Sequence, residues 1–284
     1  MADSTLDTDE VAGIYDELLK TYSKQWEHEG HRSLHLGYYD EDHDEPAGAA
    51  INTMRILSEA ANVTESDRVL NIGCGAGEDS VWNARAHGAT VLGVNISENQ
   101  LELARENARE HGVEELTTFR YDDFHELGTV EDGSVDLVWG LEAVSHSQDR
   151  RQVLDQARRV LAEGGRVAFT DLFVRTEPSD RERDRIDQIN DALGLRLGRI
   201  DEFEETLSAV GFENVTVREL TDGILPCTKR RRQFSRIAHP VGRVLGVFGV
   251  VSETQVGAFR ASSNIHELAE SGTLGYYLVT ADRE

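Results

Sequence analysis

The sequence of 284 residues lacks several features that would place it in common protein classes. No stretch approaches the roughly 20 consecutive apolar residues that a membrane-spanning helix needs, so we expect no integral membrane segment. The first residues, Met1 to Asp7, have neither the positive charge nor the apolar run of a signal peptide. Cys74 and Cys227 are the only cysteines, which argues against a disulfide framework and indicates a reduced, intracellular compartment.

Positive charge is also scarce. The chain has 53 acidic but only 29 basic residues, a net charge of −24, and its only lysines are Lys20, Lys24 and Lys229. So large a negative charge repels nucleic acid. It also makes the carboxylates of the protein repel one another, and in molar salt, where the Debye length is about 3 Å, this repulsion is screened. We therefore expect a cytoplasmic protein of a salt-adapted organism that binds no nucleic acid. An ordinary acidic protein is the alternative.

Strand and helix patterns alternate along most of the chain. Strands are expected at 68–72, 89–95, 117–121, 135–141, 166–172, 214–220 and 274–280. Helices are expected at 10–24, 47–61, 78–87, 98–111, 149–162, 175–192 and 201–210. This alternation predicts an α/β fold, a doubly wound sheet of seven mostly parallel strands.

Two segments stand outside this alternation. Residues 1–46 combine a helical pattern with a segment rich in histidine and tyrosine. Residues 226–270 carry a basic run and a glycine- and valine-rich stretch, and we expect a helical insert that caps the substrate before the last strand. The core domain is then made of residues 47–225 and 271–284.

The stretch from Val69 to Gly77 is the most informative part of the chain. A buried strand leads directly into three glycines, Gly73, Gly75 and Gly77, and a helix follows. Strand, glycine turn and helix form a nucleotide-binding unit. The dinucleotide fingerprint needs its third glycine where this chain has Glu78, and an acid there would repel a pyrophosphate at the positive helix end. A nucleoside without phosphates fits better.

Together with Asn95 at the end of the next strand and the later Asp123, this loop resembles the class I S-adenosylmethionine-dependent methyltransferases. The similarity extends from about residue 11 to the end. It is strongest to small-molecule enzymes: tocopherol, sterol and geranyl-diphosphate C-methyltransferases, natural-product O-methyltransferases and dimethylglycine N-methyltransferases. The shared segments are 34–39, 95–100 and 142–150. The resemblance implies a Rossmann-like methyltransferase fold, S-adenosyl-L-methionine as cofactor and S-adenosyl-L-homocysteine as product.

The resemblance also implies where the cofactor binds. The glycines would pack against its methionine and ribose portions, Asn95 would bind the ribose hydroxyls, and Asp123 with the Phe124 N–H would bind the adenine. Asp122 is the alternative to Asp123, and Gln100 either assists Asn95 or completes a capping box with Ser97. The expected cofactor set is Asn71, Gly73, Cys74, Gly75, Gly77, Asn95, Ile96, Gln100, Asp122, Asp123, Phe124 and Leu141. Among these, Asn71 stands where the family usually has an aspartate, and Cys74 is interpreted as a packing residue.

Glu142 and His146 are the acceptor-side candidates, because they follow the fourth strand at the carboxyl edge where ligands bind. Their i, i+4 spacing would place them on one helical face if that segment is helical. A structural role for His146 is the alternative. Tyr15 is a third catalytic candidate, on the N-terminal helix.

The aromatic N-terminal segment would form a lid over the cofactor, as it does in the resembling enzymes. Tyr15, Tyr22, His35 and Tyr38 would exclude water and place aromatic faces near the sulfonium. An aromatic cluster that packs two helices together is the alternative.

Two further groups of residues are weighed against simpler explanations. His28, His31, His35 and His43 match no structural zinc spacing, so no metal is expected. The basic run Lys229–Arg232 either binds a phosphate on a prenyl-diphosphate-like substrate or forms an exposed, ion-paired face.

An isoprenoid such as a prenylated quinone is the first expectation for the acceptor, because the insert supplies apolar side chains for a pocket. These are Val241, Val244, Leu245, Val247, Phe248, Val250 and Val251. An amine such as a glycine-betaine precursor is the second expectation. From other classes, an inactive cofactor-binding regulatory module and a nicotinamide oxidoreductase are the alternatives. A homodimer is left open.

Overall fold

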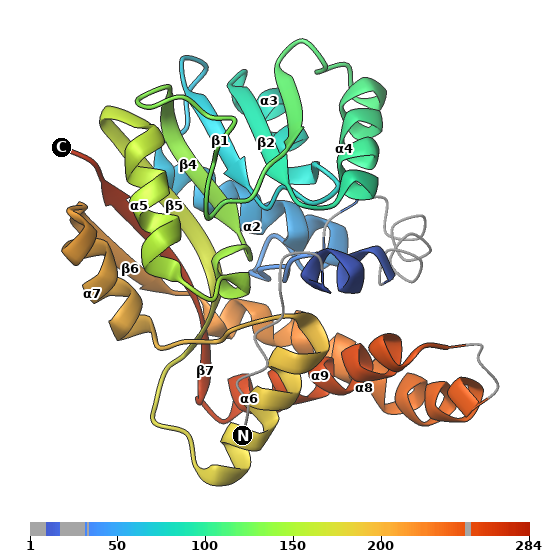
Figure 1. Cartoon of the computed structure of the whole chain (residues 1–284). Helices are drawn as coiled ribbons and strands as arrows, with labels where there is room; N and C mark the ends of the chain where they lie inside the picture. Colours follow the sequence, from blue (N-terminus) through green and yellow to red (C-terminus); the bar gives the residue numbers. More distant parts are fainter. Residues whose placement is uncertain (1–9, 18–31, 33, 248–250) are drawn as a thin grey trace.

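The computed structural model describes residues 10–17, 32, 34–247 and 251–284 (Figure 1). Residues 10–17 form a short helix that precedes the numbered elements. The predicted lid residue Tyr22 and the histidines His28 and His31 lie outside the described residues.

Seven strands form a single mixed sheet in the order β3-β2-β1-β4-β5-β7-β6. Neighbouring strands are parallel except at β7, which runs antiparallel to β5 and to β6. The strands are β1 (Arg68–Ile72), β2 (Thr90–Asn95), β3 (Thr117–Tyr121), β4 (Val135–Leu141), β5 (Leu161–Val174), β6 (Glu213–Glu219) and β7 (Leu274–Asp282). The predicted α/β sheet of seven mostly parallel strands is confirmed.

Helices cover both faces of this sheet, as Figure 1 shows. They are α2 (Pro46–Ala61), α3 (Glu78–His87), α4 (Glu98–Glu110), α5 (Arg150–Val160), α6 (Asp180–Leu193), α7 (Ile200–Val210), α8 (Thr221–Val247) and α9 (Glu253–Glu270), with a 3-10 turn η1 (Val144–His146). Successive strand residues point to opposite faces, so Val69 joins one apolar cluster and Leu70 the other. The first cluster is covered by α2, α3, α4, α6 and α9, and the second by α5 and α7.

The charged stretch expected to be helical from residue 175 begins its helix only at Asp180. β5 continues to Val174, since Phe173 and Val174 pair with the first residues of β7. A capping box then starts α6: Ser179 and Glu182 each bind the other's backbone N–H. Local capping therefore sets this boundary more sharply than the spacing of apolar residues did.

The predicted helical insert is the pair α8 and α9, which joins β6 to β7. α9 packs against both α8 and α6. Beyond this contact the pair projects from the body of the protein (Figure 1). No helix in the described part of the chain is long and apolar enough to cross a bilayer.

Candidate functional site

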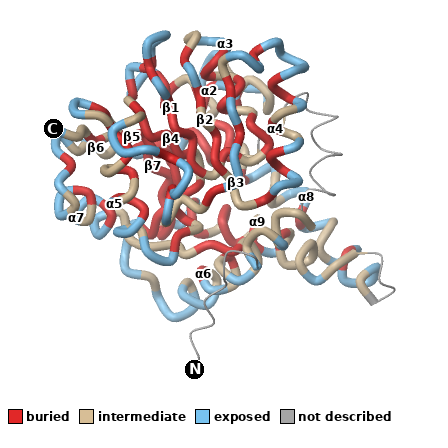
Figure 2. Tube along the Cα trace, turned by 45° about the horizontal axis from the view of Figure 1, so that its top comes forward, coloured by how far each residue is buried: buried red, intermediate tan, exposed pale blue. Residues whose placement is uncertain are grey.

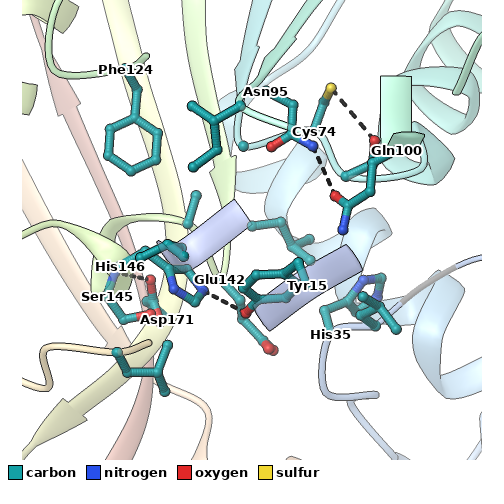
Figure 3. Close-up of a pocket in the computed structure, with 18 of the residues that line it drawn as sticks. Tyr15, His35, Cys74, Asn95, Gln100, Phe124, Glu142, Ser145, His146 and Asp171 are labelled. Atoms are coloured by element: carbon teal, nitrogen blue, oxygen red, sulfur yellow. Dashed lines mark hydrogen bonds between the residues drawn. The ribbon is translucent and has the colours of Figure 1, made fainter. Parts of the chain in front are cut away.

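A cavity of about 550 Å³ lies at the carboxyl ends of the parallel strands (Figure 3). Its walls are the loops after β1, β2, β3 and β4, the end of β5, and the helix 10–17. Residues 34–36, which we call the strap, and single side chains of α8 and α9 close the remaining side. The predicted site residues that line it are Tyr15, His35, Gly73, Cys74, Gly75, Asn95, Ile96, Gln100, Asp122, Asp123, Phe124, Leu141, Glu142 and His146.

The glycine loop adopts a backbone that other residues rarely take. Gly73, Gly75 and Gly77 have φ values of 65°, 52° and 77°. Gly73 and Gly75 line the cavity, but Gly77 does not. A Cβ on Gly77 would lie 2.7 Å from Cβ of Ala104, so this glycine lets the loop pack against α4. We therefore infer a role in helix packing for Gly77, and its expected contact with the cofactor stays a prediction.

Asn71 lies behind the loop and does not line the cavity. Its Nδ2 donates to Oδ1 of Asp79 at 2.8 Å and to Oγ of Ser80 at 2.7 Å. Trp139 Nε1 donates to Oδ2 of Asp79 at 2.9 Å, while burial raises the pKa of Asp79 to about 6. An amide at position 71 can donate to this carboxyl group, whereas a second carboxylate would repel it. Asn71 thus fixes the start of α3.

Cys74 is a buried free thiol. Burial, reinforced by the charge of Asp79, raises the pKa of Cys74 well above its ordinary value. A thiol held in its neutral form is not a nucleophile. These properties agree with its interpretation as a packing residue.

Asn95 and Gln100 form a polar pair on the cavity wall. Asn95 Nδ2 donates to Oε1 of Gln100 at 2.8 Å. The Gln100 backbone N–H donates to Oγ of Ser97, which caps α4, but the Gln100 side chain does not complete the expected capping box. Nε2 of Gln100 is buried and forms no hydrogen bond with any residue that the structure describes. A ribose hydroxyl is a group that would satisfy this donor, so the pair fits the cofactor.

Asp122 and Asp123, the two alternatives for the adenine end, differ in their partners. The carboxylate of Asp122 closes its own loop by accepting from the backbone N–H groups of Gly128 and Thr129 and from Oγ1 of Thr129. Asp123 accepts from the backbone N–H and Nδ1 of His125 at 2.8 and 2.7 Å. Since Asp122 holds the loop, Asp123 beside Phe124 is the better candidate for adenine.

His146 lies deep in the cavity and contacts the N-terminal helix. Its Nδ1 lies 3.1 Å from the carbonyl oxygen of Gly194, so Nδ1 carries the hydrogen. Desolvation lowers the pKa of His146 to about 4, which leaves the imidazole neutral near pH 7. Nε2 is then an acceptor and binds the hydroxyl of Tyr15 at 2.8 Å (Figure 3). The N-terminal helix therefore brings Tyr15 to the acceptor-side candidates.

Glu142 ends β4 in a left-handed conformation, with φ of 54°. Oε1 accepts from the backbone N–H of Leu36 at 2.6 Å and from the hydroxyl of Tyr276 at 2.9 Å. Desolvation raises the pKa of Glu142 to about 7. The expectation that Glu142 and His146 share a helical face is wrong, because only the 3-10 turn Val144–His146 follows the kink at Glu142. Both nevertheless line the cavity.

The strap is held from two sides. Arg231 of α8 donates from Nη2 to the carbonyl oxygens of Leu34 and His35, at 2.8 and 3.0 Å. Nε2 of His35 lies 3.0 Å from the carbonyl oxygen of Ala50 in α2. Tyr38 does not line the cavity and lies beside Gly223 of α8. Tyr15 and His35 thus line the cavity, where the lid prediction places them, whereas Tyr38 packs behind them; closure over the cofactor stays a prediction.

The other histidine prediction concerned metal ions. His43 contacts Asp40, with 2.7 Å between Nδ1 and Oδ1. Within the described ranges, no group of three or more metal-binding side chains is close enough to hold an ion.

Asp171 is a site residue that the sequence reasoning missed. It lies near the carboxyl end of β5, lines the cavity and accepts from the backbone N–H of Ser145 at 2.8 Å. Burial raises the pKa of Asp171 to about 6. The rule that placed Glu142 at a strand end would have found Asp171 as well. The same rule could not find Tyr276. Because β7 runs antiparallel to its neighbours, Tyr276 lies near the start of its strand and not at its carboxyl end.

Comparisons with known proteins agree with this geometry. Residues 70–169 match the family model of a methyltransferase domain. A 27-O-demethylrifamycin SV methyltransferase of Amycolatopsis mediterranei is 32% identical over 278 residues, which cover 96% of each chain. The chain belongs to the S-adenosylmethionine-dependent methyltransferases.

Other methyltransferases resemble it over similar lengths. A sarcosine/dimethylglycine N-methyltransferase of Halorhodospira halochloris is 30% identical over 250 residues, which cover 87% of this chain and 85% of the relative. A solved geranyl diphosphate methyltransferase has a TM-score of 0.79 at 20% identity and covers 98% of this chain and 99% of its own. That structure supports the fold alone.

Proposed function

We propose that this methyltransferase acts on a hydroxyl group of a small molecule and that His146 accepts the proton. The proposal rests on the hydrogen bonds of His146. Its Nδ1 contacts the carbonyl oxygen of Gly194, which assigns the hydrogen to Nδ1 and leaves Nε2 as a neutral acceptor in the cavity. When bound, S-adenosylmethionine would supply an electrophilic methyl carbon, whose bond to sulfur breaks to release the neutral thioether as the bond to oxygen forms. A hydroxyl oxygen becomes the nucleophile as its proton passes to Nε2, directly or through Tyr15.

The cofactor is proposed to lie along the glycine-loop side of the cavity. Gly73 and Gly75 offer a backbone surface there, Asn95 and Gln100 offer hydrogen bonds for the ribose, and Asp123 with Phe124 borders the adenine end. Methyl transfer of this kind depends mainly on alignment and on exclusion of water. The helix 10–17 and the strap would supply both.

The predicted isoprenoid acceptor rested on apolar side chains of the insert. Val241, Val244 and Leu245 are exposed instead, and the described residues of the insert that line the cavity are Arg231 and Ile265. An amine acceptor such as a glycine-betaine precursor would favour an aromatic cage with an arginine that binds its carboxylate. Tyr15 and Phe124 line the cavity, but Arg231 binds the strap carbonyls. The 27-O-demethylrifamycin SV methyltransferase, which aligns with this chain over 96% of its length, supports a hydroxyl group as the acceptor.

An acceptor panel tests the proposal. The protein would be incubated with methyl-labelled S-adenosylmethionine and three acceptors: 27-O-demethylrifamycin SV, a prenylated quinol and dimethylglycine. We expect a labelled methyl ether, identified by mass spectrometry and NMR, and its loss with His146→Ala. A labelled C-methyl or N-methyl product would overturn the hydroxyl proposal, and S-adenosylhomocysteine binding without any transfer would favour the regulatory module.

A further inference from the structure

The outer side of α8 carries a continuous exposed apolar stripe. Of the large apolar side chains that are exposed in the described ranges, most belong to this helix. They are Phe234, Ile237, Val241, Val244 and Leu245, with exposed fractions between 36% and 72%. At 3.6 residues per turn, their spacing places them within an arc of about 100°. We call these five residues the α8 stripe.

The inner side of α8 has a different composition and already has a partner. Thr228, Ser235 and Gly242 recur every seven residues, and the two hydroxyl residues are buried. Oγ1 of Thr228 lies 2.9 Å from Nδ1 of His266 in α9, and Gly242 lies against Phe259. The contact with α9 leaves the α8 stripe largely exposed, although the ring of Phe234 at its start also meets the edge of the Phe259 ring, with 5.9 Å between the ring centroids.

Charge around the stripe is opposite to that of the rest of the protein. From Gly223 to Ser252 there are six Lys and Arg residues and no Asp or Glu, although the chain has 53 acids. Lys229, Arg236 and Arg243 are exposed on one flank of the stripe, about 60–100° around the helix from its edge at Val244, and no ion pair joins them to another described residue. Burial and the charges of Arg243 and Arg260 lower the pKa of His239, which reflects a positive local field.

The stripe is also accessible. In Figures 1 and 2, α8 and α9 project together from the body of the protein, with exposed positions along their outer side. Arg231, on the same helix, holds the strap over the cavity. A surface that binds α8 would therefore lie next to the helix that closes the site.

We propose that the α8 stripe docks on a lipid bilayer surface with anionic headgroups. Apolar side chains on one helix face, flanked by arginine and lysine, are the features that let a helix lie in the interface of such a bilayer. The stripe enters the boundary between headgroups and acyl chains, while Arg236 and Arg243 meet phosphate oxygens. The helix lies on the membrane and does not cross it.

Other occupants fit less well. A second copy docking stripe to stripe would bring like charges together, because Arg236 and Arg243 would face their own copies. Docking of the stripe on the acidic body of a second copy lacks an apolar counterpart, since outside α8 only Ile51 and Tyr121 are exposed large apolar residues in the described ranges. Nucleic acid offers phosphates for the basic residues but no apolar surface that the α8 stripe could enter.

Vesicle flotation tests this proposal. The full chain is mixed with vesicles of phosphatidylcholine alone or of phosphatidylcholine with phosphatidylglycerol, in the lowest KCl concentration that preserves its circular dichroism spectrum. Two paired variants are compared: Arg236→Gln with Arg243→Gln, and Ile237→Asn with Val244→Asn. Arg109→Gln with Arg218→Gln, both exposed and outside the projecting part of α8 that carries the stripe, is the matched charge control.

We expect the protein to float with the anionic vesicles only. Each α8 pair should lower the bound fraction at least about fivefold, and the control pair should not. Circular dichroism and S-adenosylhomocysteine binding check that the variants are folded. No flotation with anionic vesicles, equal flotation with phosphatidylcholine alone, or unchanged flotation of both α8 pairs would overturn the proposal. So would a dimer in sedimentation velocity that Ile237→Asn with Val244→Asn dissociates, because the stripe would then bind a second copy.

Discussion

The backbone N–H of Leu36 donates to Oε1 of Glu142 at 2.6 Å and ties the strap to the end of β4. The hydroxyl of Tyr276 donates to the same oxygen. Glu142, first considered as a catalytic group, is thus also an anchor for the segment that closes the cavity.

Removing this anchor should destabilise the protein. Glu142→Ala leaves the Leu36 N–H without its acceptor and leaves the Tyr276 hydroxyl with only Oγ1 of Thr170, 3.2 Å away. An unsatisfied buried group costs about 1–3 kcal/mol. Glu142→Gln keeps an oxygen there and should lose less. Urea unfolding measures both variants. Equal losses would show that the bonds to Leu36 and Tyr276 contribute little.

The same carboxyl group should make stability depend on pH. Its pKa of about 7 in the folded protein lies above the ordinary value of 4.5, so between these values the folded protein binds more protons than the unfolded chain. The free energy of unfolding therefore falls as the pH rises from about 4.5 to 7. In Glu142→Gln the free energy of unfolding should depend less on pH across this range. The difference between the wild-type and variant slopes isolates the contribution of Glu142 from that of the other titrating groups. An unchanged slope would contradict the pKa shift.

His146→Ala should lower kcat about 100-fold, the usual contribution of a general base. The Kd for S-adenosylhomocysteine should stay unchanged, because His146 lies on the acceptor side. Since the pKa of His146 is about 4, the wild-type rate should show no titration of this group between pH 5 and 8. His43→Ala, which changes a histidine outside the cavity, is the control. Retained kcat would assign His146 a structural role.

Gln100→Leu should weaken cofactor binding about tenfold, equivalent to about 1.4 kcal/mol. The variant loses the buried Nε2 donor, and it also loses Oε1, which accepts the hydrogen bond from Asn95. Calorimetric titration with S-adenosylhomocysteine measures the effect. Glu102→Gln, on an exposed position of the same helix, should bind normally. If both variants bind equally well, the pair does not contact the ribose.

Two glycines with similar backbone angles allow the cost of backbone strain to be measured separately from the cost of overpacking. Gly112 has φ of 66° and open space around it, whereas a Cβ on Gly77 would meet Ala104. Gly112→Ala should cost about 1–2 kcal/mol of stability for the left-handed backbone alone. Gly77→Ala should cost about 1–3 kcal/mol more, from overpacking against α4. Equal losses in denaturant unfolding would show that the loop relaxes away from α4.

The prediction of salt adaptation is tested by thermal unfolding in increasing KCl. Screening of the net charge of −24 should raise Tm by at least about 5 °C at molar concentrations, or roughly 1–2 kcal/mol. Sucrose, which is excluded from protein surfaces without screening charge, is the control. No gain in KCl beyond that in sucrose would favour an ordinary acidic protein.

The sheet could be predicted from the sequence because its signals are local. A buried strand ending at Ile72 and the glycines that follow it define β1 and its loop within a few residues. The direction of β7 could not be predicted, since an apolar strand such as Leu274–Asp282 reads alike in either direction. Tyr276 consequently appeared in no sequence-based site.

The conformation around Glu142 was equally hidden. The i, i+4 spacing to His146 is compatible with a helix. The left-handed backbone of Glu142 prevents one, and Glu142 is held there by bonds to distant residues: its N–H donates to the carbonyl oxygen of Thr170, and its carboxyl group accepts from Leu36 and Tyr276. The insert was misjudged for a related reason. Apolar residues such as Val244 predicted a pocket lining, but sequence alone does not tell which side of a helix meets its neighbour.

The strand order gives the molecule two separable halves. β3, β2 and β1 carry the loops assigned to the nucleoside, while β4, β5 and β7 carry Glu142, Asp171 and Tyr276. α8 and α9 lie between β6 and β7 in the chain, so they are connected to this second half of the sheet. Exchange of the α8–α9 arm for that of a relative should therefore yield chimeras with altered acceptor range and unaltered affinity for the methyl donor. Diversification of acceptors in such a scaffold needs no change in the glycine loop.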